Sequence, residues 1–199
     1  MNKLRRVRIA GKMDVPAINA IVDRAVESWD VAERLKRLAV KEYRYRQEDL
    51  DHMWLLVAEG GDGDLLGVAA LEDVGRGTPQ MTGHTLLLHG IYVEADVMGS
   101  GVGSDLLRAS SGIASALGYD GLLVKAVRQS RGFFRNRGLK LLPNENPQDY
   151  PYRYWLPTNS APVPQALASD FPFDPRSSKA SCRRSTMPSS PARRYFRGS

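Results

Sequence analysis

The sequence has few of the residues that hold small or secreted folds together. Its 199 residues include one cysteine, Cys182, and three histidines. A single cysteine excludes an internal disulfide, and three histidines without cysteine companions offer no zinc-binding spacing. No apolar run is long enough to cross a bilayer, and the basic start of the chain leads into no apolar stretch of signal-peptide length. The sequence therefore predicts a cytoplasmic protein that binds neither a metal nor a membrane.

Apolar residues are also scarce from position 159 to the end of the chain. Proline, serine and basic residues dominate 159–199. Such a segment buries too little apolar surface to offset the entropy lost on ordering, so we expect a disordered tail. Residues 1–158 alternate instead between strand-like and helix-like apolar periodicity, and their number suits one α/β domain.

The net charge of +6 is distributed unevenly along the chain. The tail contains seven basic and two acidic residues, so it carries five of the six excess positive charges. The 1–158 domain is close to neutral, which disfavours nucleic acid as its partner. A nucleic acid or an acidic partner bound through the basic tail stays an alternative.

The apolar patterns predict alternating strands and helices, with Asp14 as the cap of the first helix. The expected strands are 4–9, 54–58, 65–71, 85–93, 122–127, 139–142 and 152–156. The expected helices are 14–29, 31–43, 48–53, 101–117 and 130–137. This order predicts a single α/β domain rather than separate all-α and all-β parts.

Three glycines at alternate positions stand between a strand and a helix, in the sequence Met-Gly-Ser-Gly-Val-Gly of residues 98–103. Glycine lets the backbone approach a ligand closely, and N–H groups at the start of a helix attract anions. The arrangement suits a pyrophosphate. It is not a Walker loop, because no Gly-Lys-Ser/Thr follows, and its spacing differs from the dinucleotide fingerprint. The alternative is a loop that only turns the chain.

Val93, followed after four residues by 98–103, resembles the acetyl-CoA pyrophosphate loop of the GNAT acetyltransferase superfamily, usually Val-x4-Arg/Gln-Gly-x-Gly-x-Gly/Ala. Residues 130–139, SRGFFRNRGL, are similar to the second signature of that family, Ala-x-x-Phe-Tyr-x-x-x-Gly-Phe. The resemblance covers residues 4–156. It implies a mixed, mostly antiparallel sheet flanked by helices, α/β (α+β) in class, and an acyltransferase with acetyl-CoA as co-substrate and no metal.

The resemblance also implies where the co-substrate lies. In that family a bulge splays the strand before the loop from its neighbour, and the pantetheine arm lies in the gap. The backbone facing the arm would be that of Ile91, Tyr92 and Val93. The N–H groups expected to hold the pyrophosphate are those of Met98, Gly99, Ser100, Gly101, Val102, Gly103 and Ser104. The opposite wall would be lined by Ser130, Phe133 and Phe134, although either phenylalanine can simply pack in the core.

Three residues depart from the family pattern. Met98 stands where arginine or glutamine is usual, which removes a polar side chain but leaves the backbone cradle. Val127 stands near a position where many members have asparagine. Phe134 replaces the tyrosine that protonates the departing thiolate in many members. Either Ser130, a nearby tyrosine or water would do so here, or the protonation would not be needed.

Transfer of an acetyl group to an amine requires a general base and a hydrogen-bond donor for the developing oxyanion. Backbone N–H near Tyr92 or Val93 would supply the donor. The candidate catalytic bases are His89, on the strand before the loop, and Glu72, at the end of the preceding strand. The alternatives are an ordinary strand histidine and a solvated strand end.

Acceptor specificity in this family comes from the first two helices and the closing strands. Trp29, Tyr43 and Tyr45 are therefore predicted to contact the substrate, with core packing as the alternative. The predicted function is transfer of an acetyl group from acetyl-CoA to an amine of a small molecule or peptide, directly in a ternary complex, by a monomer or homodimer. The alternative within the same fold is a non-catalytic acyl-CoA-binding module.

Overall fold

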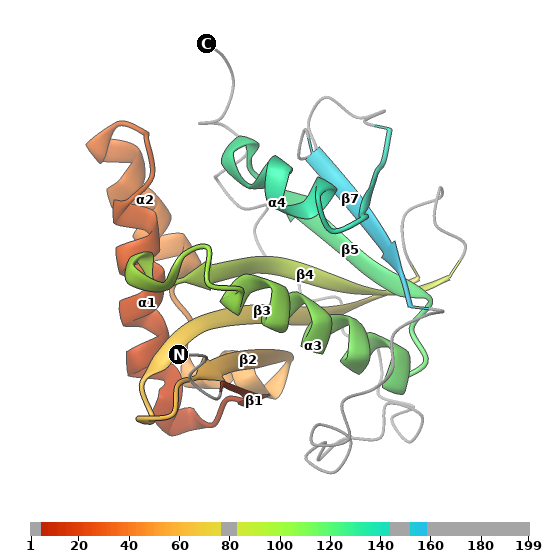
Figure 1. The fold of residues 1–199 in the computed structure, drawn as a ribbon, viewed down its shortest axis with the longest axis horizontal. Coiled ribbons are helices and arrows are strands. Elements are labelled where there is room, and N and C mark those ends of the chain that lie inside the picture. The colour runs from red at the N-terminus through yellow and green to blue at the C-terminus, as the bar shows by residue number, and fades with distance from the viewer. Residues whose placement is uncertain (1–4, 77–82, 144–151, 159–199) are drawn as a thin grey trace.

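The structure is a computed structural model, and it describes residues 5–76, 83–143 and 152–158 (Figure 1). One 7-stranded sheet has the order β1-β2-β3-β4-β5-β7-β6. Neighbouring strands are antiparallel except β4 and β5, which are parallel, so the expected mixed and mostly antiparallel sheet is confirmed. The predicted tail, 159–199, lies outside the described residues. The strands are β1 Arg6–Ile9, β2 Met53–Glu59, β3 Leu65–Arg76, β4 His84–Val93, β5 Gly121–Ala126, β6 Lys140–Leu141 and β7 Tyr152–Pro157.

Helices cover both faces of the sheet. Figure 1 shows α3 lying across the sheet, α1 and α2 together at one end, and α4 beside β5 and β7. Within the described residues no helix is both long and apolar enough to cross a membrane. The helices are α1 Val15–Glu27, α2 Glu33–Tyr43, α3 Val102–Ala116 and α4 Arg131–Arg135, with 3-10 turns at Lys12–Asp14, Gln47–Asp51, Ala95–Val97 and Arg128–Ser130.

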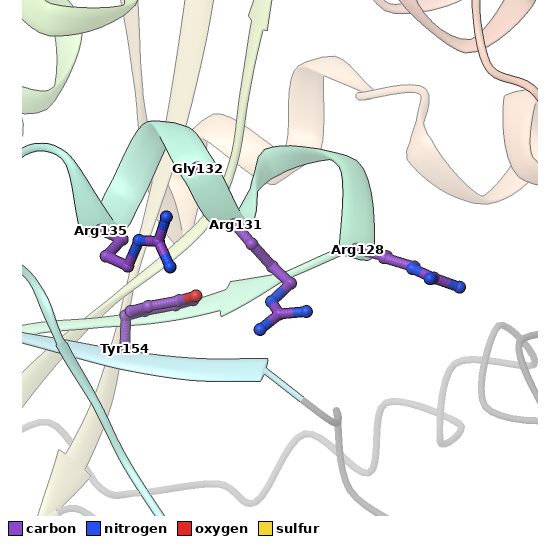
Figure 2. Close-up of a pocket in the computed structure, with 5 residues that line it drawn as sticks. All are labelled: Arg128, Arg131, Gly132, Arg135 and Tyr154. Atoms are coloured by element: carbon purple, nitrogen blue, oxygen red, sulfur yellow. The ribbon is translucent and has the colours of Figure 1, made fainter.

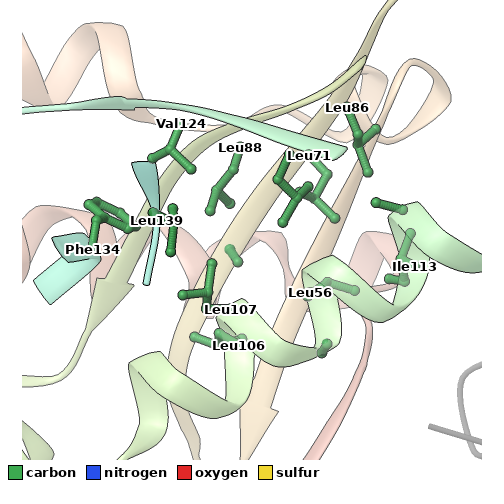
Figure 3. Close-up of a cluster of buried hydrophobic side chains, with 14 of the residues drawn as sticks. Leu56, Leu71, Leu86, Leu88, Leu106, Leu107, Ile113, Val124, Phe134 and Leu139 are labelled. Carbon is green, nitrogen blue, oxygen red and sulfur yellow. The ribbon is translucent and has the colours of Figure 1, made fainter. Parts of the chain in front are cut away.

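The larger core lies between α3 and one face of the sheet (Figure 3). Alternate residues of a strand point to the same face, so Leu86 and Leu88 of β4 enter this core together. Leu106 and Ile113 of α3 meet them and are fully buried or nearly so. Each such side chain contributes roughly 2 kcal/mol through the removal of apolar surface from water. This layer fixes α3, and hence the loop before it, against the sheet.

A second core lies between the other face of the sheet and helices α1 and α2. Ile18, Ile21 and Val22 recur at helical spacing in α1 and pack with Leu55 and Val57 of β2. No residue of α2 is buried, although Ala39, Val40 and Tyr43 pack partly against this core. The α2 helix therefore packs against the second core through one face, and its other side chains are exposed or half-buried.

Asp14 does not cap α1 with its side chain, which corrects the expectation from the sequence. Its carboxylate accepts a hydrogen bond from the Gly11 N–H (2.8 Å) and pairs with the Arg8 guanidinium (2.7 Å). The hydrogen bond from Arg8 lowers the pKa of Asp14, while partial burial opposes the shift. The sequence pattern correctly placed Asp14 directly before α1 but gave its carboxylate the wrong partner. The carboxylate binds Arg8 of β1 rather than the first N–H groups of the helix.

Candidate active site

Strand β4 loses one of its two neighbours halfway along its length. Its first half pairs with β3 on one edge and with β5 on the other. The pairing with β5 ends at Leu88, which lies opposite Val124. Beyond that point, as far as Val93, β4 pairs only with β3 among the described strands. One backbone edge is therefore open to a ligand, as the expected splay requires.

A β-bulge marks the point where the strands part. Leu88 pairs with Leu71, whereas Gly90 pairs with Ala70, so His89 is the extra residue. A bulge bends its strand and redirects the side chain at that position. The rim of the gap thus carries a histidine, one of the two predicted bases.

The loop after β4 has the backbone conformation that its glycines predict. Gly99 and Gly101 have φ values of 78° and 98°, a region that side chains other than glycine rarely adopt. Gly101 is the N-cap residue of α3, and Val102 is the first residue of the helix. The loop therefore places the N-terminus of α3 beside the open edge of β4.

The backbone hydrogen bonds show which N–H groups of the loop are available. Those of Met98, Ser100 and Ser104 close turns within the loop at 2.9–3.1 Å. Those of Gly99, Gly101, Val102 and Gly103 form no hydrogen bond to the described part of the chain. Four of the seven N–H groups expected to face a pyrophosphate are therefore available as donors, two of them in the first turn of α3.

The two predicted bases are in direct contact. His89 Nε2 lies 2.5 Å from Glu72 Oε2, and the two side chains are 38% and 34% exposed. The hydrogen bond from His89 lowers the pKa of Glu72, partial burial opposes this, and the nearby charges of Lys125 and His52 add to the lowering. An ionised Glu72 accepts the Nε2 proton, which leaves Nδ1 of His89 as a proton acceptor.

The helix α4 forms the other side of the gap, but its three predicted residues differ in what they contact. The Ser130 hydroxyl donates to the Val127 carbonyl oxygen (3.0 Å), which stabilises the turn before α4. Phe133 packs against α3 so closely that a Cβ on Gly103 would lie 3.1 Å from its ring. Phe134 is 4% exposed and packs on the aromatic core, so the packing alternative describes it.

Comparison with known proteins agrees with this architecture. The model of the acetyltransferase (GNAT) family matches residues 18–139, more than half of the chain. The chain belongs to the GNAT acetyltransferase family. A sequence comparison with curated proteins gives no match.

Solved GNAT structures share the fold at low sequence identity. The PaiA N-acetyltransferase of Thermoplasma acidophilum, solved with coenzyme A, is 14% identical, and the match covers 77% of this chain and 99% of that one with a TM-score of 0.64. A GNAT acetyltransferase of Brucella melitensis, solved with acetyl-CoA, is 19% identical over 82% and 93% of the chains with a TM-score of 0.56. An N-acetyltransferase of Staphylococcus aureus Mu50 is 24% identical over 78% and 99%, with a TM-score of 0.54.

Two arginines that the GNAT signatures do not include flank the glycine loop. Arg5 Nη1 donates to the Ser100 carbonyl oxygen (2.7 Å), and Arg5 Nη2 pairs with Asp105 in the first turn of α3 (3.2 Å). Arg137 Nε donates to the Ser104 hydroxyl from the other side (2.9 Å). Neither contact has a local sequence signal, because Arg5 precedes Ser100 by 95 residues and Arg137 follows Ser104 by 33.

Arg137 lies near the loop in which Met98 stands where the family pattern has arginine or glutamine. The Met98 side chain is 60% exposed and brings no charge to the loop. Arg137 brings a guanidinium to the first turn of α3 and stacks over the Phe133 ring, 4.0 Å from its centroid. The positive charge that the loop lacks at Met98 is therefore present nearby on a different element.

The predicted acceptor-binding aromatics lie in the layer between the sheet and helices α1 and α2. Tyr43 contacts Trp29 edge-on, with ring centroids 5.7 Å apart, and approaches Tyr92 with centroids 6.4 Å apart. The backbone of Tyr45 exchanges two 2.8 Å hydrogen bonds with Asn19, and burial raises the pKa of the Tyr45 hydroxyl. Trp29 and Tyr43 share this layer with Tyr92, whose strand borders the gap.

Proposed function

We propose that the protein is an acetyl-CoA-dependent N-acetyltransferase that transfers the acetyl group directly to an amine of a small molecule or peptide. One observation carries the proposal. The bulge that ends the pairing of β4 with β5 also holds His89, hydrogen-bonded to Glu72, at the rim of the open strand edge. Acyl donor and base would thus meet at one point of the sheet.

The residues present fit acetyl-CoA. The open edge of β4, including Ile91 and Val93, can hydrogen-bond an extended amide-containing arm, and the N–H groups of Val102 and Gly103 point out of the first turn of α3. Arg137 adds a cation beside that turn. When bound, acetyl-CoA supplies an acetyl thioester as the acyl donor.

The chain's own residues supply the proton transfer. Glu72 holds the Nε2 proton of His89 and orients the ring, and Nδ1 of His89 accepts a proton from the acceptor ammonium, directly or through one water. Backbone N–H groups of β4 beyond the bulge are the donors for a carbonyl oxygen in the gap. Glu72 also stabilises the charged imidazolium that results, in the manner of a base and its orienting carboxylate.

The test is acetyl-CoA turnover by the full-length protein against a panel of small amines and peptides, with thermal melting in parallel. We expect acetyl-CoA to raise the melting temperature by mass action. The substitution Gly101→Glu should remove that rise for two reasons. Residues other than glycine rarely adopt a φ of 98°, and the added carboxylate repels an anion at the loop. Gly118→Glu, at another positive φ just beyond the opposite end of α3, serves as the matched control. No melting shift at millimolar acetyl-CoA overturns the proposal.

A second candidate is an acyl-CoA-binding module without turnover. Its support is Phe134, which is buried and has no hydroxyl where many GNAT members have a tyrosine. Tight acetyl-CoA binding with no CoA release across the whole amine panel favours the module. CoA release that depends on both an amine and His89 favours the enzyme.

A further inference from the structure

The stretch from β5 to β6 is basic and contains no acidic residue. Residues 121–144 include no Asp or Glu. The near neutrality of the 1–158 domain therefore hides a local excess of positive charge, balanced by acidic residues elsewhere. The basic residues of this stretch are Lys125, Arg128, Arg131, Arg135, Arg137 and Lys140.

Three of these arginines share one face of α4 and the turn before it. Arg128, Arg131 and Arg135 are spaced by three and four residues, so their side chains leave the helix on the same side. All three are exposed. With Gly132 and Tyr154 they line a hollow of about 280 Å³, and Figure 2 shows Arg131 and Arg135 lying on the β7 side of α4 with Tyr154 beneath.

This arginine face, defined as Arg128, Arg131 and Arg135, is separate from the cofactor loop. Arg137, which follows α4 in the chain and does not line the hollow, contacts Ser104 at the start of α3. In the described part of the chain none of the three arginines forms an ion pair. Arg131 stacks on the Tyr152 ring instead, 4.3 Å from its centroid, which leaves the N–H groups at the edge of the guanidinium free to donate.

We propose that the arginine face binds the phosphate backbone of a nucleic acid. Guanidinium groups match phosphate oxygens with two parallel hydrogen bonds, and a row of them along a helix can contact successive phosphates. Among the described residues, the lining of the hollow includes no aliphatic side chain that could receive an anchor residue of an acidic peptide. This proposal revises the expectation from net charge, because binding depends on where the charges cluster.

The first test compares two triple variants of the full-length protein that lose the same charge. Arg128→Gln, Arg131→Gln and Arg135→Gln together remove the arginine face. The control replaces Arg34, Arg37 and Lys41 with glutamine, all exposed on α2. Both variants keep the basic tail. Affinity for a fluorescent single-stranded RNA of about 20 nucleotides is measured by anisotropy across a salt series, because phosphate contacts make binding salt-dependent.

We expect the arginine-face variant to bind the RNA about tenfold more weakly at low salt, and the slope of log affinity against log salt to fall by about 2, as three lost phosphate contacts require. The control stays within about twofold of wild type because its cations lie elsewhere. Both variants retain the melting shift with acetyl-CoA, so this outcome is independent of the proposed enzymatic function.

A second pair of variants leaves every arginine in place. A Cβ on Gly132 would meet nothing within 4 Å, and its φ is not positive, so a longer side chain fits there. Gly132→Glu places a carboxylate in the hollow, whereas Gly132→Gln adds the same volume without charge, and both favour the helix over glycine. We expect the glutamate variant to lose RNA affinity and the glutamine variant to keep it.

Several results would overturn the proposal. Equal weakening by the two triple variants assigns RNA binding to overall charge. Unchanged RNA affinity with lost acetyl-CoA binding assigns the arginine face to the cofactor site. Loss of binding to poly-glutamate with unchanged RNA affinity assigns it to an acidic protein partner. If the first triple variant fails to fold, the Gly132→Glu and Gly132→Gln pair decides alone.

Discussion

The two halves of β4 belong to one strand but differ in pairing and in burial. From Thr85 to Leu88 the strand is paired on both edges and its side chains are almost wholly buried. From His89 to Val93 it is paired on one edge, and most of its side chains are partly accessible. One strand thus contributes both the centre of the sheet and the edge of the gap.

This contrast shows how a stable sheet can contain a backbone edge without a strand partner. Backbone N–H and C=O groups without partners are costly when buried, so an open edge inside a sheet needs a ligand or water. Here the pairing with β5 ends at Leu88, next to the bulge at His89, while the pairing with β3 continues and holds the open half in place. Substitutions in the two halves should therefore separate catalysis from stability.

The largest effect is expected for His89→Ala. Loss of the base should lower kcat by about 10³-fold, while the melting temperature stays near that of wild type because the side chain is 38% exposed. The matched control is His84→Ala, at the exposed start of the same strand. A variant at His89 that keeps full kcat would show that the open half of β4 carries no base.

Leu86→Ala should lower stability and leave kcat nearly unchanged, the reverse of the effects expected for His89→Ala. Leu86 is 0% exposed at the centre of the α3 core, so its truncation leaves a cavity and lowers the free energy of unfolding by about 3 kcal/mol. The kcat of the folded fraction should change little. Leu141→Ala, at a residue that is 54% exposed, is the control for denaturant unfolding. A loss of kcat without a loss of stability would contradict the division of β4.

Glu72→Gln tests whether Glu72 acts through His89. A glutamine amide can donate to Nε2, which favours the tautomer with a proton on Nδ1, so kcat should fall by about 10²-fold. KM for acetyl-CoA should stay near that of wild type, because Glu72 contacts His89 and acts through it. Glu72→Asp keeps a carboxylate and should restore part of the activity. Equal loss of kcat in Glu72→Asp and Glu72→Gln would contradict the orienting role of Glu72.

The smallest effect is expected far from the gap, at the pair of Asp14 and Arg8. The pKa of Asp14 is lowered in the folded state, so its contribution to stability is complete at neutral pH and is lost as pH falls. Asp14→Asn should cost about 1 kcal/mol at pH 7. The difference from wild type should begin to shrink near the ordinary carboxyl pKa of about 4 and vanish only below the lowered pKa of folded Asp14. Urea unfolding at several pH values measures it, and a pH-independent difference would contradict the assignment.

Local pattern was a good guide to the elements and to the glycine loop. The strand, loop and helix around residues 85–117 were predicted close to their observed bounds, because period and glycine spacing are local properties. The end of the third strand was placed too early, at Leu71, although it runs to Arg76. Glycine and charged residues at its end weaken the apolar alternation without preventing sheet pairing.

The candidate site was only partly predictable. His89 and Glu72 were chosen separately as bases, but their contact depends on a bulge whose register no sequence period reveals. Arg5 and Arg137 were missed because each reaches the loop from a distant element. Phe133 and Phe134 looked alike as neighbours, and only packing separates the ring at the gap from the ring in the core.

The order of elements, the glycine conformations of the loop and the resemblance to an acetyltransferase can be predicted from the sequence, because they depend on neighbours along the chain. Which distant charges act together depends on the fold. Net charge is a sum over residues, whereas electrostatic attraction depends on distance, so only the folded chain shows that Arg5 and Arg137 lie at the glycine loop and that Tyr154 of β7 lies beside Arg131 and Arg135.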